Sequence, residues 1–341
     1  MLKSLQKAFK VKEVRDRLLY TFMMLVVIRI GCCLPIPGVD PSYLHDFFSN
    51  LQNSGMGFFN AITGGSFSSM SIFALSITPY ITSSIIMQLL TIAIPKLEEM
   101  QKDGEDGRKK IAEYTRYLTV GLALFESCAM AVGLGGKGLL LEDHRNIWGY
   151  LTVVAAMTAG SALLMWIGER ITDNGVGNGI SIVLLINIVS GTPQDMMTLY
   201  ERFMAGRSVA VATVSGIIVL AIIVAIVVFV LVLNDAERRI PVQYSKKMQG
   251  RRMIGGQSTY IPLKVNTANV IPVIFASSIM SMPVMIAQFF HVDYSTIGGK
   301  ILLALSSSNW FKPEAPAYSI GMLVYIVLVV LFAYFYTSIT F

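Results

Sequence analysis

Residues 64–92 read GGSFSSMSIFALSITPYITSSIIMQLLTI. The stretch begins with glycines and serines, continues through Pro79, and ends as an apolar run that could enter a membrane. Because backbone polar groups in lipid must be satisfied internally, a broken helix is tolerated only where protein covers it or where it lines a water-filled cavity. We therefore expect this stretch to face an interior. An ordinary proline kink inside a packed bundle is the alternative.

The composition of the whole chain is that of a membrane protein. Of 341 residues, 54% are hydrophobic and 14% are charged, and the mean hydropathy is +0.62. Soluble domains carry about 25% charged residues. The sequence predicts an all-α, polytopic membrane helical bundle. Its expected spans, each near the ~20 apolar residues that a bilayer requires, are 18–35, 72–94, 117–136, 147–168, 178–195, 209–233, 265–290 and 319–341.

Lysine and arginine are concentrated in alternate loops. One set of segments carries twenty lysines and arginines: those up to Arg17, 95–116 and 234–264, together with Arg170. The opposite set of loops carries six. Because cytoplasmic loops are enriched in these residues, the N-terminus is predicted to be cytoplasmic. The net charge of +6 is explained by topology, without nucleic acid binding.

The sequence offers no pattern typical of an enzyme, a metal site or a cofactor site. The histidines lie far apart in predicted loops, and the cysteines lie in apolar runs without disulfide spacing. The glycine-rich GVGNG at 175–179 follows no strand, so a nucleotide site is not expected there. The residues concerned are His45, His144, His291, Cys32, Cys33 and Cys128.

A second interrupted span resembles the first. Residues 269–283 read NVIPVIFASSIMSMP and residues 78–88 read TPYITSSIIMQ, so each has Pro, then Ile, then Ser-Ser-Ile. The two spans are five apart, which predicts pseudo-symmetric, inverted five-helix halves at 1–195 and 196–341, the second incomplete. Interrupted helices at matching places in two halves indicate a central pathway.

The side chains around the breaks are mostly branched aliphatics. They would form a hydrophobic constriction, or waist, of the pathway that excludes ions and could widen around a large substrate. Periodicity alone also fits an ordinary core. A secondary transporter with discontinuous helices is the competing function, and it would need polar or ionisable groups at the waist. The aliphatic residues are Ile77, Ile81, Leu184, Ile188 and Ile274.

Few polar residues lie inside the spans. Arg29 is expected to snorkel to the outer interface or to anchor the topology. Glu126 could be a proton site, have a buried partner, or be neutral. Asn187 and Gln88 are suited to hydrogen bonds between helices.

Several motifs, in order and at the right spacing, make the chain similar to the SecY family of translocase channel subunits. Residues 64–91 resemble that family's second-helix signature, and 173–182 (DNGVGNGISI) the start of its fifth helix. Residues 249–279 (QGRRMIGGQSTYIPLKVNTANVIPVIFASSI) resemble its segment into helix seven, and 29–40 (RIGCCLPIPGVD) the end of helix one.

The resemblance implies a channel that passes unfolded secretory polypeptides across the bacterial plasma membrane and releases hydrophobic segments sideways into lipid. It implies a pore ring formed by the aliphatic residues named above, and a plug at about 57–71. The plug includes Gly64, Gly65, Ser66, Phe67, Ser68 and Ser69, and its small residues suit a segment that leaves its seat and returns. A lateral gate would include Thr82, Ser83, Gln88, Ser278 and Met282.

The resemblance also implies partners. The loop 234–264 would dock the ribosome or the SecA motor through Lys246, Lys247, Arg251 and Arg252. The alternative is that these charges only fix topology. SecE and SecG subunits and secretory and membrane protein precursors would be further partners, and no metal or cofactor is implied.

The resemblance is incomplete at the C-terminal end. The chain ends in YTSITF, at the end of the eighth expected helix, whereas the family continues with a cytoplasmic loop and further helices. We therefore expect either a fragment or a truncated protein, and a non-functional fragment of the channel is a further alternative.

Overall fold

The structure is a computed structural model that describes residues 10–40, 63–135, 138, 140–141, 145–242, 247–249, 252–254, 259–289, 296–306, 310 and 316–340. The chain forms two compact units. The first comprises Met1–Pro193 and Ser277–Ile326, and the second comprises Gln194–Ala276 and Val327–Phe341.

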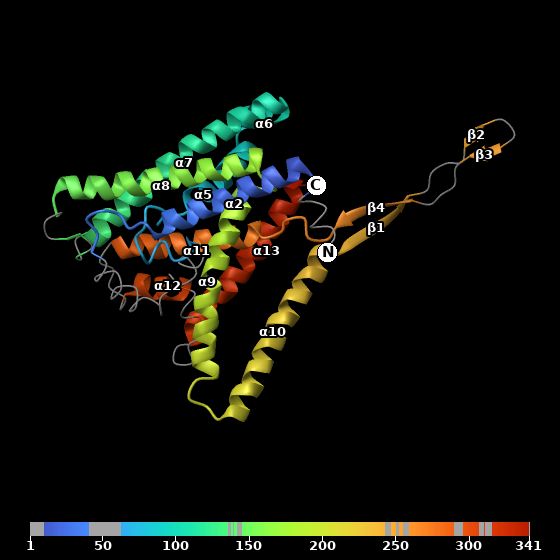
Figure 1. The fold of residues 1–341 in the computed structure, drawn as a ribbon. Coiled ribbons are helices and arrows are strands. Elements are labelled where there is room, and N and C mark those ends of the chain that lie inside the picture. The colour runs from blue at the N-terminus through green and yellow to red at the C-terminus, as the bar shows by residue number, and fades with distance from the viewer. Residues whose placement is uncertain are drawn as a thin grey trace. The chain divides into compact units, whose positions relative to one another are not determined.

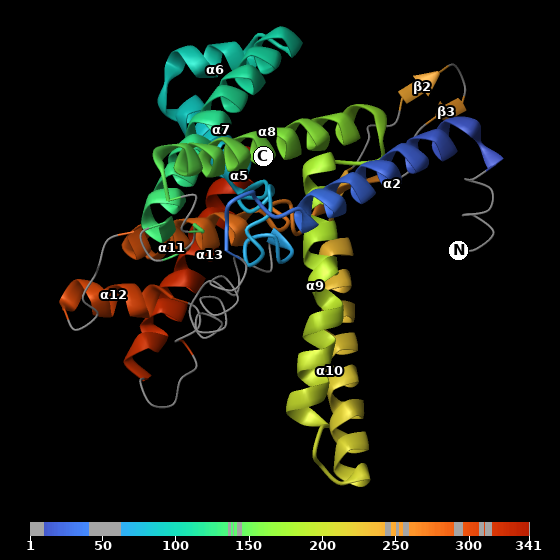
Figure 2. The same cartoon turned by 60° about the vertical axis from the view of Figure 1, so that its left-hand side comes forward.

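The centre of the first unit is a bundle of long helices. These are α2 (Lys12–Cys33), α5 (Thr78–Ala93), α7 (Glu105–Leu134), α8 (Ile147–Asn174) and the beginning of α9 (Gly179–Phe203). Helix α8 packs against both α7 and α2, and α5 packs against α7, as Figures 1 and 2 show. Their apolar faces enclose the core of this unit.

The predicted basic loop 95–116 is largely helical. Helix α6 (Pro95–Lys102) follows α5 with a bend of 101°, and α7 already begins at Glu105. Pro95 is the first residue of α6 and ends the preceding helix, because its ring is compatible only with the first turn of a new one. The charged residues of this region therefore lie mainly on α6 and on the first turns of α7.

Two helices begin later than the sequence predicts. Helix α5 begins at Thr78 and α11 (Ile271–Phe289) at Ile271, so Pro79 and Pro272 are each the second residue of a helix. Proline fits there because the first N–H groups of a helix have no intrahelical partner. The predicted spans 72–94 and 265–290 were wrong at their starts: these prolines begin a helix and do not interrupt one.

The backbone before the two helices is also alike. Ser76 and Asn269, each three residues before the proline, have φ of +52° and +51°. Non-glycine residues rarely adopt positive φ, and they cluster at functional sites when they do. The sequence similarity between the two interrupted spans thus extends to a local backbone conformation.

The first unit also contains elements between 296 and 326 that the sequence did not predict. Helix α12 (Ile297–Leu305) packs on the 3-10 helix η4 (Pro316–Ser319), which leads into α13 (Ile320–Thr340). The Trp310 indole donates to the Ala304 carbonyl at 2.9 Å, and the Ser319 hydroxyl donates to the Trp310 carbonyl at 2.6 Å.

The second unit contains α10 (Val209–Asp235) and a basic β-hairpin. Strand β1 (Glu237–Val242) pairs antiparallel with β4 (Thr259–Lys264), and β2 (Lys247–Gln249) pairs antiparallel with β3 (Arg252–Ile254). The hairpin follows directly from the end of α10 in Figure 1. A loop was expected at 234–264; its described residues include two pairs of antiparallel strands.

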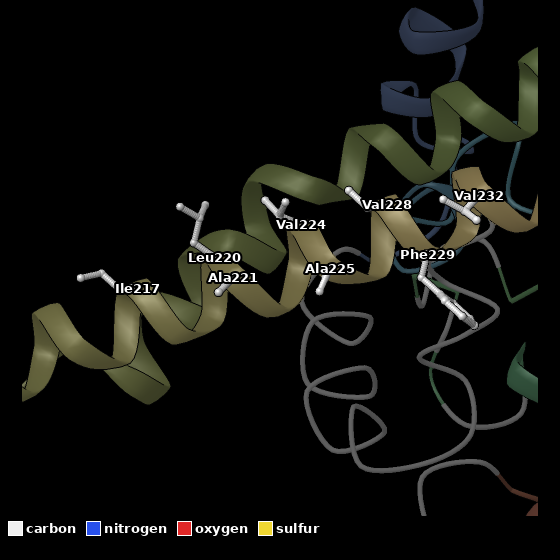
Figure 3. A pocket seen from close by; sticks show the side chains of 8 residues that line it. All are labelled: Ile217, Leu220, Ala221, Val224, Ala225, Val228, Phe229 and Val232. Carbon is white, nitrogen blue, oxygen red and sulfur yellow. The ribbon is translucent and has the colours of Figure 1, made fainter.

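Most side chains of α10 are apolar and none is buried, and Figure 3 shows those that line a shallow groove. They are Ile217, Leu220, Ala221, Val224, Ala225, Val228, Phe229 and Val232. Within the described residues, four helical segments are long and apolar enough to cross a membrane, or five if α5 and α6 form one bent span. Each of the eight predicted spans overlaps a helix of the structure.

Candidate functional site

An aliphatic cluster surrounds the beginning of α5. Ile77, immediately before the helix, is completely buried and packs with Ile167 on α8 and Val183 on α9. Ile81 and Leu184 are partly buried against the same cluster. The structure thus brings together three of the five predicted ring residues. Ile188 is 53% exposed, and Ile274 belongs to the second unit, where it is half-buried in the first turn of α11.

Residues 63–77 precede α5 as a series of tight turns rather than a helix; we call them the seated segment. Phe67 is 1% exposed and Met70 is fully buried, and both pack in a core with Met157 of α8. This packing is deeper than the glycine and serine content predicts. The described part of the predicted plug, 63–71, lies here, and 57–62 lie outside the described residues.

Serine hydroxyls and main-chain N–H groups both donate to carbonyls within the seated segment. The Ser68 and Ser69 hydroxyls donate to the Gly65 carbonyl at 2.9 and 3.1 Å, and the Ser71 N–H donates to the Ser66 carbonyl at 3.0 Å. Short polar side chains form such local bonds in place of a helix. These local bonds pair polar groups of the turns with one another. The turns can therefore be buried together with the Phe67 side chain.

The chain following α2 holds the other side of the seated segment. The Ile36 N–H donates to the Met70 carbonyl at 3.1 Å, and the Ile72 N–H donates to the Leu34 carbonyl at 3.0 Å. The Cys32 thiol, 5% exposed, lies beside the Ser66 hydroxyl. Cys33 and Cys128 are exposed.

A polar network connects the seated segment with α2 and α9. Arg29 Nη1 donates to Ser190 Oγ at 2.8 Å and reaches the Gly64 carbonyl at 3.5 Å. The Ser190 hydroxyl donates to the Asn187 carbonyl at 2.6 Å, and Asn187 Nδ2 donates to Ser76 Oγ at 3.0 Å. Arg29 was expected to snorkel to the outer interface or to anchor the topology; in the structure its guanidinium bonds to α9 and reaches the seated segment. Asn187 was expected to bond to another helix; its partner Ser76 lies instead in the turns before α5.

Sequence comparison identifies the family. The SecY family model matches residues 71–341. The protein translocase subunit SecY of Streptomyces scabiei is 44% identical over 353 residues, covering 100% of this chain and 77% of that protein. The SecY subunit of Thermus thermophilus is 39% identical over 346 residues, covering 100% of this chain and 76% of that protein. The chain belongs to the SecY family.

Solved structures share the fold of this SecY chain. One, described as a protein-conducting channel, has a TM-score of 0.58 and 19% identity, and the match covers 93% of this chain and 71% of that chain. Another has a TM-score of 0.57 and 19% identity, covering 96% and 75%; its plug domain is described as stabilising the closed state of the channel and maintaining a membrane seal. The seated segment and the aliphatic cluster are the candidate functional site of this chain.

The residues expected at a SecY lateral gate have different surroundings. The Thr82 and Ser83 hydroxyls donate to carbonyls of their own helix, those of Thr78 and Pro79, at 3.1 and 2.8 Å. Ser83 is completely buried, Gln88 is exposed, Ser278 is half-buried and Met282 is 40% exposed. These two hydroxyls thus bond within α5.

Two of the four expected docking residues lie within the described strands. Lys247 and Arg252 lie on β2 and β3, and Gln249 opposes Arg252 in the register. Lys246 and Arg251 lie outside the described residues. Sequence reasoning missed the stacking of the Arg239 guanidinium over the Tyr260 ring, at 4.8 Å. That contact follows from the pairing of β1 with β4, which the sequence analysis did not predict.

Ionisable groups are few in the rest of the bundle. Glu126 Oε2 on α7 is buried and accepts no hydrogen bond from the described residues. At the end of the apolar part of α7, Arg116 Nε donates to Glu169 Oε1 of α8 at 2.7 Å. This hydrogen bond raises the pKa of Arg116. Among the residues that the structure describes, no group of three or more His, Cys, Asp and Glu could hold a metal ion.

Proposed function

We propose that this chain is the central protein-conducting subunit of a bacterial Sec translocase. It passes unfolded secretory polypeptides across the membrane and releases hydrophobic segments sideways into lipid. The observation that carries the proposal is the seated segment: irregular backbone, buried in protein, placed directly before a membrane helix that begins with Pro79. Irregular backbone at membrane depth is expected where protein or a pathway covers it.

In this proposal residues 57–71 are the plug, whose described part, 63–71, is the beginning of the seated segment. Ile77, Ile81, Leu184, Ile188 and Ile274 form the ring around the translocating chain. Aliphatic side chains suit that role because they exclude hydrated ions and form no hydrogen bonds or ion pairs with the polypeptide that passes. Phe67 anchors the resting plug, since burial of one large apolar side chain is worth about 1.5–3 kcal/mol. A contribution of this size keeps the plug seated and can still be overcome by an entering polypeptide.

The partners and the orientation are part of the proposal. The N-terminus is cytoplasmic, and the hairpin at 237–264 therefore extends into the cytoplasm, where it docks the ribosome or the SecA motor. Arginine is suited to both partners, because it binds RNA phosphates and protein carboxylates through paired hydrogen bonds. SecE and SecG are the proposed companion subunits, and Thr82, Ser83, Gln88, Ser278 and Met282 the proposed lateral gate.

Site-specific photocrosslinking tests the proposed pathway. A photoreactive amino acid is placed at Ile81 or Ile274 while a secretory polypeptide is arrested in transit. We expect crosslinks from both positions, because a translocating chain must pass the ring.

A matched control is the same probe at Leu151, an exposed apolar residue of α8. Crosslinks equally strong from Leu151, or none from Ile81 and Ile274 while the polypeptide remains engaged, would contradict the proposed pathway.

A further inference from the structure

The seated segment is attached to α9 at both of its ends. At the beginning, the Gly64 carbonyl and Ser190 on α9 share the guanidinium of Arg29. At the end, Ser76 accepts from Asn187, one turn before Ser190 on α9. Both attachments are polar, whereas the contacts of Phe67 and Met70 between them are apolar.

Gly64 allows the attachment at the beginning. A Cβ atom there would lie 2.9 Å from the Cα and the carbonyl oxygen of Asn187, and 2.9 Å from Ser190 Oγ. The backbone of the segment therefore lies directly on α9. Its φ of +64° is a conformation that glycine adopts without strain.

Arg29 is suited to hold this contact. A guanidinium inside an apolar helix is costly unless it is hydrogen-bonded or reaches the interface. Here its Nη1 atom lies within hydrogen-bond distance of acceptors on two different elements, at 2.8 and 3.5 Å. If the seated segment moves away, the Arg29 guanidinium loses the Gly64 carbonyl as an acceptor. The loss of this acceptor favours the state in which the segment stays in place.

We propose that Arg29 is the positioning residue of the plug: together with Ser190 it forms a latch that holds Gly64 on α9 and thereby biases the channel toward its closed state. This inference rests on the proposed function, in which the seated segment closes the channel. It adds which residue outside the segment sets the balance between the closed and open states. Phe67 supplies apolar packing, and the latch supplies the bond that breaks when the segment moves.

The test is the resting ion conductance of the reconstituted full channel complex in a planar bilayer, without a translocating polypeptide. Interhelical hydrogen bonds in membrane proteins have strengths that correspond to about a 3- to 18-fold change in an equilibrium. We expect Arg29→Gln to raise the resting conductance by a factor in this range, and Ser190→Ala to raise it in the same direction. Arg29→Lys, which keeps the charge and a donor, is expected to lie between Arg29→Gln and the parent.

Arg17→Gln is the matched control. Arg17 lies on the same helix and also donates to a carbonyl, that of Gly175 at 3.4 Å, but it does not touch the seated segment. Its resting conductance is expected to equal that of the parent. If Arg29→Gln does not assemble, Ser190→Ala alone decides, because it removes an acceptor of the latch and leaves the helix charge unchanged.

A deletion of residues 63–71 separates the latch from the proposed function. If the deletion raises the resting conductance while Arg29→Gln and Ser190→Ala do not, the latch is wrong and the plug assignment stands. If the deletion itself leaves the conductance unchanged, the plug assignment fails together with the latch. Equal effects of Arg17→Gln and Arg29→Gln would likewise overturn the proposal, because they would reflect only the loss of a charge from α2.

Discussion

At the scale of single residues, the adjacent positions Gly64 and Gly65 require glycine for different physical reasons. Both have positive φ, +64° and +81°. A Cβ at Gly64 would meet the backbone of α9 at 2.9 Å, whereas a Cβ at Gly65 would have nothing within 4 Å. The pair therefore separates backbone strain from close approach at adjacent positions of the same segment.

We predict that Gly65→Ala costs only the left-handed strain of an L-residue, roughly 1–2 kcal/mol. Gly64→Ala should cost this strain and in addition about 1–3 kcal/mol for overpacking against α9. Thermal unfolding of the purified complex in detergent measures both, and the transition of Gly64→Ala should be the lower. Equal transitions would mean that the segment does not lie on α9 as described.

Not every residue of the site could be identified from the sequence. The aliphatic residues Ile77, Ile81 and Leu184 lie together as the sequence pattern indicated. The direction of Arg29 could not be predicted, because a long side chain near a helix end reaches either the interface or a buried acceptor. Its acceptors are a carbonyl of the seated segment and Ser190, which is 161 residues away in the chain.

At the scale of elements, the approach of α8 to the seated segment depends on Gly160. A Cβ at this position would lie 1.9 Å from the Ile72 carbonyl oxygen, a backbone atom that cannot rotate away. Helices and segments in membranes associate closely where small residues lie at the contact, because the packing itself drives association. Gly160 thus sets the distance at which the seated segment rests on α8.

We predict that Gly160→Ala destabilises the folded protein by about 1–3 kcal/mol, the usual cost of forcing a methyl group into a filled core. Gly121→Ala on α7 is the control, because a Cβ there meets nothing within 4 Å. It should be neutral or slightly stabilising, since alanine is favoured over glycine in helices by up to about 1 kcal/mol. Monodispersity after a heating series, measured by size-exclusion chromatography, compares the two, and similar losses would argue against the close contact.

Element boundaries were harder to predict than the elements themselves. Each predicted span overlaps a helix, because long apolar runs are a strong signal. The starts of α5 and α11 were misplaced because proline both breaks and begins helices, and only the backbone before it decides between the two. The hairpin of β1 and β4 gave no clear signal, since its strands are exposed and carry charges.

At the scale of the whole molecule, the charged residues and the apolar helices are segregated. The apolar surface of α10 suits lipid or a partner helix, and the hairpin that follows it is basic and exposed. In the proposed function the hairpin receives the motor or the ribosome, and α10 connects it to the membrane part of the second unit. The docking assignment predicts a loss of motor-driven transport without a loss of assembly.

We predict that Arg251→Glu combined with Arg252→Glu strongly reduces SecA-driven export, because each reversal replaces an attraction to carboxylates by a repulsion. Membrane insertion of the protein itself should be unchanged. Export of a reporter into inverted membrane vesicles measures the first, and carbonate extraction measures the second. The control is Arg202→Glu combined with Arg207→Glu, two charge reversals in a loop predicted to lie on the other side of the membrane, and it should leave export intact. Normal export in the Arg251 and Arg252 variant would show that these two charges only set topology.

The burial of Cys32 beneath the seated segment has a kinetic consequence. Its thiol lies beside Ser66 and is 5% exposed, while Cys33 next to it and Cys128 on α7 are exposed. Cys33 and Cys128 lie on the expected spans of α2 and α7, where an exposed side chain faces lipid, so they are no reference for alkylation from water. A small water-soluble alkylating reagent reaches Cys32 only during excursions that uncover it, just as amide exchange measures local opening elsewhere. The alkylation rate of Cys32 thus reports how often the seated segment opens in the resting protein.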